Sequence, residues 1–160
     1  MLVHHQAIKN LTPTDYIIIE KEHAELARFL IDLQEACACC NLNSPPDCQN
    51  CMHEKKSSCQ GRLPSFLFYV IDLVAKHFDH EENIMLSRPN VTEQYEYFRK
   101  HRQAHIDILQ KLDTLAQECI SLDKSGNTHE AYRQLNMQFS RMLETHDSDF
   151  DDPFIHSTKT

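Results

Sequence analysis

Glycine and tryptophan are scarce in this sequence, and long hydrophobic runs are missing. The 160 residues include two glycines, Gly61 and Gly126, and no tryptophan. Sheet-rich folds need many tight turns, so the scarcity of glycine favours helices joined by few connections. No apolar stretch approaches the roughly 20 residues of a transmembrane helix, so we expect no membrane partner. A chain of this length is expected to form one domain.

Positive charge is also in deficit. Sixteen lysines and arginines face 24 aspartates and glutamates, which gives a formal net charge of −8 at pH 7. A net acidic surface repels phosphate backbones, so we expect no nucleic-acid partner. The first residues lack the charged start and apolar core of a secretion signal, and the expected location is therefore the cytoplasm.

Histidine and cysteine, by contrast, are abundant. The chain has 11 histidines and seven cysteines, and six of the cysteines fall between positions 37 and 59. In a reducing compartment, clustered cysteines indicate metal binding or redox chemistry more than structural disulfides.

Four segments place apolar residues at steps of three and four, the period of an amphipathic helix. They span about 14–38, 63–86, 91–121 and 128–150. Pro64 suits the first turn of the second segment, and Asn90 with Glu93 has the spacing of a capping box for the third. Short turn signals join the last three segments, whereas 39–62 is long and cysteine-rich. The sequence thus predicts an all-α, up-down-up-down four-helix bundle with a cysteine-rich loop between the first two helices.

Each predicted apolar stripe carries histidine where a hydrophobic residue is expected. Burial of an unpaired imidazole is unfavourable, and a lone buried histidine usually has its own polar partner. Five such residues on four inward faces are better explained by a shared metal. The five are His23, His77, His101, His105 and His146.

The spacing of these residues supports a metal site. His101 and His105 are four residues apart, about 40° round a helix, so both rings can reach one metal. His77 and Glu81 have the same spacing and combine a nitrogen ligand with a carboxylate that can bridge two metals. Neighbouring His80 and Glu82 lie off the stripe and are expected at the surface.

Taken in order, these motifs resemble the hemerythrin pattern of H, HxxxE, HxxxH and HxxxxD. The resemblance covers nearly the whole chain apart from 39–62. It implies a non-haem di-iron site with two oxide- or hydroxide-bridged irons and one open position that binds dioxygen. It also implies that three histidines of the last two helices hold one iron and two of the first two helices hold the other. The implied ligands are His23, His77, Glu81, His101, His105, His146 and Asp151.

Asp151 needs a distorted helix end to act as a ligand. It follows His146 by five residues, about 140° round an ideal helix, and helix geometry alone would prefer Asp149. The family pattern selects Asp151 and so requires local unwinding or a π-type turn. The rival carboxylates are Asp147, Asp149 and Asp152. Phe150 is the candidate lining of an oxygen pocket, and its polar neighbours favour sensing or redox chemistry over long-lived reversible binding.

The cysteine cluster is a second candidate metal or redox site. Its members are Cys37, Cys39, Cys40, Cys48, Cys51 and Cys59. The CxxC motif at 48–51 resembles a zinc knuckle, with His53 as a further candidate ligand. A structural zinc, a thiol redox switch and unliganded thiols all remain open.

The leading hypothesis is a protein that binds or senses dioxygen and signals through a separate protein partner, rather than an enzyme. One alternative is a ferritin-like di-iron oxidase or peroxidase. Such sites usually carry paired Glu-x-x-His motifs and four carboxylates, whereas only Glu20-x-x-His23 matches here. A second alternative is a role in iron or nitric oxide stress. The sequence does not set the oligomeric state.

Overall fold

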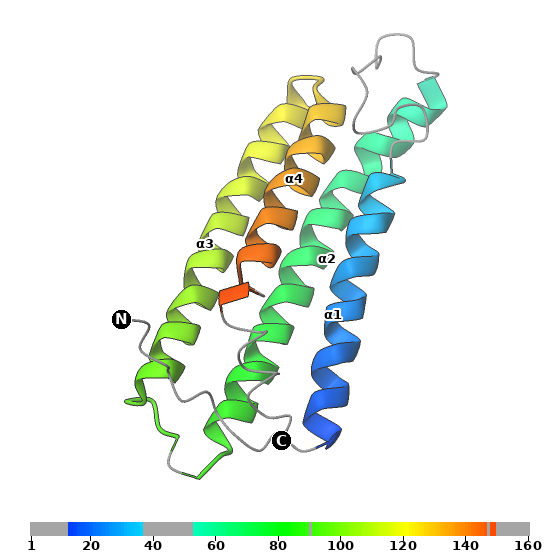
Figure 1. The fold of residues 1–160 in the computed structure, drawn as a ribbon. Coiled ribbons are helices and arrows are strands. Elements are labelled where there is room, and N and C mark those ends of the chain that lie inside the picture. Colours follow the sequence, from blue (N-terminus) through cyan, green and yellow to red (C-terminus); the bar gives the residue numbers. More distant parts are fainter. Residues whose placement is uncertain (1–12, 37–52, 90, 147, 150–160) are drawn as a thin grey trace.

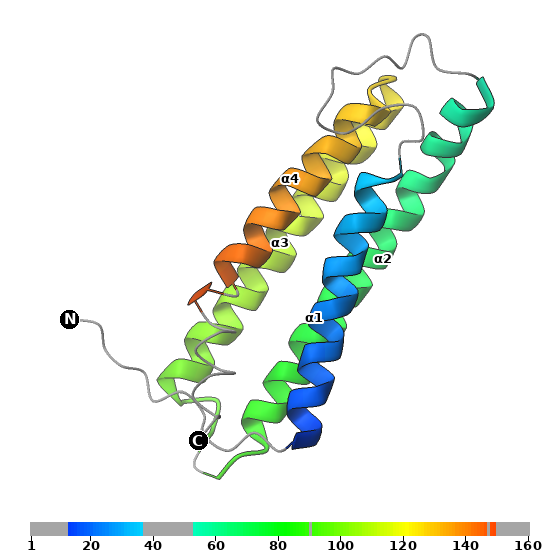
Figure 2. The same cartoon turned by 45° about the vertical axis from the view of Figure 1, so that its right-hand side comes forward.

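The regular structure of this chain is helical throughout its described part. The computed structural model describes residues 13–36, 53–89, 91–146 and 148–149. Four helices pack together along their lengths (Figures 1 and 2). They are α1 (Pro13–Gln34), α2 (His53–Leu86), α3 (Glu96–Lys124) and α4 (Thr128–His146). The predicted all-α class with four packed helices is confirmed. No helix in the described ranges is long and apolar enough to cross a membrane.

Contacts at the two ends of α1 show how it runs against α2. Near the start of α1, Asp15 forms an ion pair with Arg88, which follows the end of α2. Just past the end of α1, the carbonyl oxygen of Ala36 accepts a hydrogen bond from Cys59 Sγ at 3.6 Å, near the start of α2. The two helices are therefore antiparallel, and the colour gradient in Figure 1 shows the same directions.

α2 begins ten residues earlier than its predicted start at 63, which shortens the expected 39–62 loop. Pro64, expected in the first turn, lies inside the helix and removes one backbone hydrogen bond there. Burial offsets this loss, because Cys59 is 7% and Leu63 1% exposed. The Tyr132 hydroxyl also donates a 2.6 Å hydrogen bond to the carbonyl oxygen of Cys59, which ties the extra turns to α4.

The predicted start of α3 near residue 91 is wrong, since the helix begins at Glu96. Thr92 instead organises a turn, with its carbonyl oxygen bonded to Tyr95 N at 3.0 Å and its hydroxyl to Gln94 N at 3.2 Å. Tyr95 occupies the N-cap position without a side-chain cap. The capping box expected from Asn90 and Glu93 therefore does not begin this helix. Asn90 itself lies outside the described residues.

The other helix ends differ from prediction by a few residues. α1 ends at Gln34 rather than 38, and α3 continues to Lys124 rather than 121. α3 stops where Gly126 adopts a positive φ of 85°, a conformation that glycine reaches without strain. α4 ends at His146 rather than 150, and Ser148 and Asp149 beyond it are π-helical. This distortion agrees with the π-type turn expected after His146.

The interior contains two apolar clusters, one on each side of the histidines along the helices. The main apolar core joins all four helices, while the small apolar core joins the start of α1 to the facing ends of α2 and α3. The fully buried members of the main core include Leu33, Val70, Val74, Leu112, Cys119, Ala131, Tyr132, Leu135 and Phe139. The small core consists of Ile19, Ile84, Met85, Tyr97 and Phe98.

Candidate metal centre

Every helix sends at least one histidine into the layer between the two apolar cores. His23 comes from α1, His77 from α2, His101 and His105 from α3, and His146 from α4. Four of these rings are buried, with at most 3% of each residue exposed, and the His23 side chain is 23% exposed. Glu81 of α2 lies among them and is fully buried. The structure thus brings together the five predicted histidines and the predicted carboxylate.

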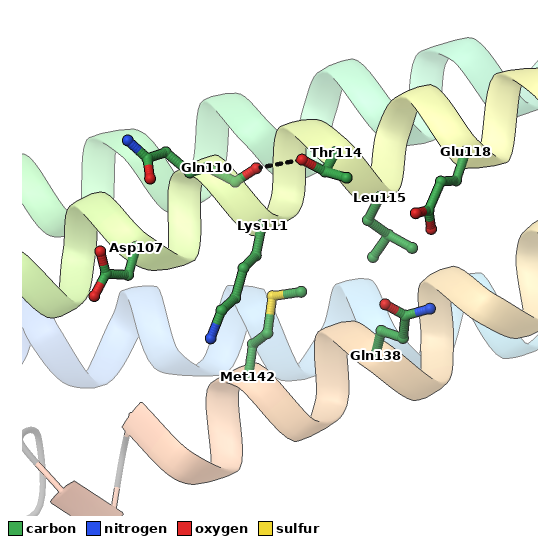
Figure 3. Close-up of a pocket in the computed structure, with 8 residues that line it drawn as sticks. All are labelled: Asp107, Gln110, Lys111, Thr114, Leu115, Glu118, Gln138 and Met142. Atoms are coloured by element: carbon green, nitrogen blue, oxygen red, sulfur yellow. Dashed lines mark hydrogen bonds between the residues drawn. The ribbon is translucent and has the colours of Figure 1, made fainter.

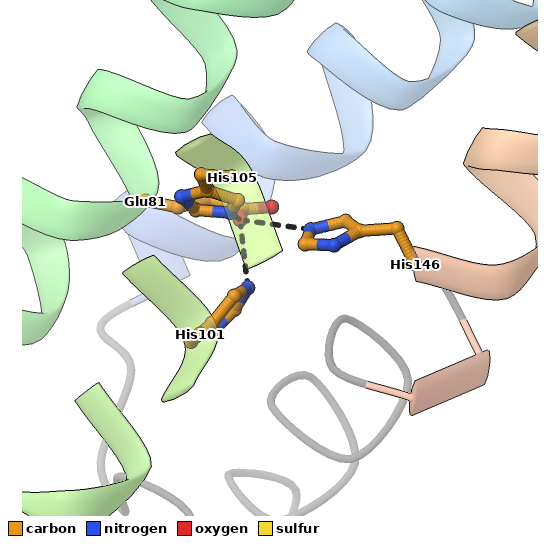
Figure 4. A group of neighbouring side chains, drawn as sticks. All are labelled: Glu81, His101, His105 and His146. Carbon is orange, nitrogen blue, oxygen red and sulfur yellow. Dashed lines mark hydrogen bonds and ion pairs between the residues drawn. The ribbon is translucent and has the colours of Figure 1, made fainter. Parts of the chain in front are cut away.

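The two oxygens of Glu81 divide the histidines into two groups. Oε1 lies 2.8 Å from His77 Nε2 and 3.8 Å from His23 Nε2. Oε2 lies 3.1 Å from His105 Nε2, 3.2 Å from His101 Nε2 and 3.8 Å from His146 Nε2. Figure 4 shows the second group, with rings from α3 and α4 turned toward the same carboxylate.

Each group has the geometry of a potential metal site. The ligand atoms of His23, His77 and Glu81 all lie within 4.8 Å of one another, and so do those of the larger group. The larger group consists of Glu81, His101, His105 and His146. Nitrogen and carboxylate ligands suit iron and other borderline transition metals. This buried cluster could therefore hold a metal ion in either group, with Glu81 common to both.

The electrostatics of Glu81 also favour a cation. Burial alone would raise the pKa of this carboxyl, but the charge of His77 and hydrogen bonds from His101, His105 and His146 lower it well below the ordinary value. Glu81 is therefore an anion that faces several ring nitrogens at once. When these rings are protonated, the inner nitrogens donate to Glu81, and a metal ion that binds there replaces the protons.

Two further carboxylates contact the outer nitrogens of ligand histidines. Glu22 Oε2 lies 3.1 Å from His77 Nδ1, and its Oε1 lies 2.7 Å from His80 Nδ1. Glu82 Oε1 lies 2.9 Å from His105 Nδ1. As expected, neither His80 nor Glu82 belongs to a candidate ligand group, although Glu82 is less exposed than the surface position expected for it. His80 is half exposed but bonded to Glu22, while the Glu82 side chain is only 22% exposed.

The sequence analysis did not single out Glu22, although its position in the apolar pattern of α1 marks it as buried. The buried positions of α1 follow strict steps of three and four, and Glu22 is one of them. These positions are Ile19, Glu22, Leu26, Phe29 and Leu33. An acidic residue on a heptad-like stripe beside a candidate ligand indicates a buried partner. No comparable pattern marks Glu82, which directly follows Glu81 at the edge of the stripe.

Aromatic rings hold the histidines of the larger group. Phe78 stacks on His105 with ring centroids 3.9 Å apart and planes inclined by 7°. The same ring lies 5.1 Å from that of His146, and Tyr97 meets His101 edge-on at 5.6 Å. Phe78 belongs to the main apolar core and Tyr97 to the small one. Both cores therefore contact the candidate ligands directly.

The other candidates for this centre lie near the end of α4. Asp149 is exposed and belongs to neither group of candidate ligands. Asp151 and Phe150 lie outside the described residues.

Of the six cysteines, only Cys59 lies within the described chain. It is buried in the main apolar core as a free thiol. The others are Cys37, Cys39, Cys40, Cys48 and Cys51, and they fall in the undescribed stretch 37–52.

A groove between α3 and α4 reaches the histidine layer from the surface. One cavity of about 390 Å³ lies along it, with the Lys111 side chain beside Met142 (Figure 3). A second cavity of about 310 Å³ shares Asp107, Lys111 and Met142 with the first and has His146 in its lining. Both acidic and basic side chains line this groove, so its charge favours neither sign of ligand.

Comparisons with known proteins identify no relative of this chain, so the candidate site is assigned from its geometry alone. No protein-family model, curated protein or solved structure matches this chain.

Proposed function

We propose that this chain is a non-haem di-iron protein that binds or senses dioxygen. The observation that carries the proposal is the division of five histidine Nε2 atoms between the two oxygens of Glu81, two on Oε1 and three on Oε2. A carboxylate with a different nitrogen group on each oxygen is suited to bridge two metals. The same division is the one that the hemerythrin resemblance implies, and the antiparallel run of α1 and α2 supports the up-down-up-down topology that we propose.

The ligand composition favours oxygen binding over a ferritin-like oxidase. Sites of the ferritin-like kind usually have four carboxylates. Among the described residues, Glu81 is the one carboxylate in the two candidate groups, and the rest are histidines. A bound pair of irons would supply an open coordination position for dioxygen, while this chain's buried rings would hold the irons and exclude bulk water. Asp151 remains the proposed second bridging carboxylate.

Metal analysis is the direct test of this proposal. The purified chain should contain about two irons, as expected for a di-iron carboxylate site. His77→Ala and His105→Ala, one in each group, should each lose iron because each removes a buried nitrogen ligand. Gln103→Ala, on the exposed face of α3, serves as the control and should keep its iron. Unchanged iron in both histidine variants would show that the site is misassigned.

Oxygen chemistry is tested with the ferrous protein under anaerobic conditions. Addition of dioxygen should produce a visible absorption band that disappears when the oxygen is removed and returns when it is restored. Irreversible oxidation with multiple turnovers would instead support an oxidase. A stable, fully reversible cycle favours carriage, whereas slow oxidation after one cycle favours sensing.

The proposal also covers the cysteine-rich segment, the cellular location of the protein and its signalling partner. We propose that this segment holds a structural zinc or a thiol switch that couples redox state to a separate signalling protein in the cytoplasm. Cys59 lies in the main apolar core, so its burial favours the other five cysteines as zinc ligands. Zinc at about one per chain in the same metal analysis would support the first reading.

A further inference from the structure

His77 and His105 each face a carboxylate with both ring nitrogens. His77 faces Glu81 with Nε2 at 2.8 Å and Glu22 with Nδ1 at 3.1 Å. His105 faces Glu81 with Nε2 at 3.1 Å and Glu82 with Nδ1 at 2.9 Å. The inner nitrogen of each ring thus points into the cluster, and the outer nitrogen contacts an acid of a neighbouring helix.

Glu22 is a fixed acceptor. Only 8% of this residue is exposed, and hydrogen bonds from two histidines occupy its two oxygens. The carboxylate of Glu22 is an acceptor, and each of its two oxygens meets the Nδ1 atom of one histidine. Hydrogen on the Nδ1 atoms of His77 and His80 would satisfy both contacts.

We infer that Glu22 and Glu82 are positioning residues that hold His77 and His105 with hydrogen on Nδ1 and the Nε2 lone pair aimed into the centre. The inference rests on the proposed metal centre for its purpose. A neutral imidazole has one donor and one acceptor nitrogen, so a hydrogen bond that fixes the donor also fixes which nitrogen is the ligand. Carboxylates of this kind orient the ring and raise its basicity toward a metal.

The two acids serve different halves of the centre. His77 belongs to the group on Glu81 Oε1, and His105 to the group on Oε2. Removal of one acid should therefore weaken one metal position and spare the other. Glu22 should have the larger effect, because its side chain is 11% exposed against 22% for Glu82 and water competes less with its hydrogen bond.

The first experiment needs no metal. The ring nitrogen chemical shifts of the full-length metal-free chain, recorded above the titration range of histidine, report which nitrogen carries hydrogen. His77 should be in the Nδ1–H form in the wild type. It should lose that preference in Glu22→Leu, and partly keep it in Glu22→Gln, where an amide oxygen still accepts. A wild-type tautomer in Glu22→Leu would overturn the inference for His77, and Glu82→Leu tests His105 in the same way.

The second experiment measures metal binding by the same variants. Titration of the anaerobic metal-free chain with Fe²⁺ should show one of two positions weakened by about 10- to 100-fold in Glu22→Leu. Glu82→Leu should weaken the other position, with a smaller change. Asp32→Asn is the matched control, since Asp32 is exposed on the same helix and the variant should bind as the wild type does.

The outcomes of the two experiments are separable. A wild-type chain that binds no iron would defeat the proposed function, while the tautomer measurement would still decide the inference. A wild-type chain that binds two irons, with wild-type affinity at both positions in Glu22→Leu and Glu82→Leu, would defeat the inference alone. Thermal unfolding of each variant confirms that it is folded before metal is added.

Discussion

The main apolar core and the histidine layer occupy neighbouring stretches of the same four helices but depend on different interactions. In the core, fully buried rings and aliphatic chains such as Phe139, Leu135 and Leu112 contact one another with no polar partner to satisfy. In the histidine layer, each ring depends on carboxylates, and all five inner nitrogens face one residue, Glu81. The core stabilises the fold by itself, whereas the layer is costly to desolvate and would gain stability from a bound cation.

The largest effect on stability is expected in the core. Phe139 is fully buried and meets Phe29 edge-on with ring centroids 5.8 Å apart. Phe139→Ala should lower the free energy of unfolding by about 3–5 kcal/mol, because it removes a large ring and leaves a cavity. Urea denaturation of the metal-free chain measures the loss. The folded variant should still bind as many irons as the wild type, and a lost metal position would show that the two regions are not separable.

The next effect belongs to the histidine layer and depends on metal. Saturation of a site at about 100 times its dissociation constant adds about 2.7 kcal/mol to the free energy of unfolding. Glu81→Gln should abolish this gain, since Glu81 is the one residue common to both candidate groups. The metal-free variant should lose less stability than Phe139→Ala does. Thermal unfolding with and without Fe²⁺ decides the point, and an undiminished metal shift in Glu81→Gln would exclude it as a bridging ligand.

The same contrast shows what the sequence could predict. The periodicity of apolar residues at steps of three and four predicted the number of helices and their inward faces. It also pointed to six candidate ligands, because the histidines and Glu81 lie on the same inward faces as the apolar residues. Helix ends were less predictable, since the start of α2 depends on a hydrogen bond from Tyr132 to Cys59, 73 residues away. The role of Glu82 was also hidden, because a carboxylate at the edge of a stripe finds its histidine only after α2 and α3 pack.

Phe78 lies at the border between the two regions and should affect both to a moderate extent. Its ring stacks on His105 and also belongs to the main apolar core. Phe78→Leu keeps an apolar side chain, so the expected loss of unfolding free energy is less than about 1.5 kcal/mol. The loss of the stacked ring should also weaken iron binding in the three-histidine group, because His105 gains freedom. Equal binding in the variant and the wild type would mean that Glu82 alone fixes this ring.

The smallest effect is expected where neither region is involved. On the surface of α4, Glu130 bonds Arg133 Nε at 2.8 Å and Gln134 Nε2 at 2.8 Å. These hydrogen bonds, and most of all the one from Arg133, lower the pKa of Glu130 from 4.5 to about 2. Because the folded pKa is the lower one, the stabilising contribution is present above pH 4.5 and is lost as the pH falls through about 2.

Glu130→Gln should therefore lower the free energy of unfolding only slightly, and only at pH values where Glu130 is ionised. The Glu130 side chain is 32% exposed, so solvent screens the pair and the loss at neutral pH should stay below about 0.5 kcal/mol. Urea denaturation of both metal-free proteins at several pH values should show this difference narrow as the pH falls from 4.5 toward 2. A difference that widens on acidification would reverse the sign and exclude a lowered folded pKa. A loss as large as that of Phe139→Ala would mean that this surface acid supports the core through contacts of α4.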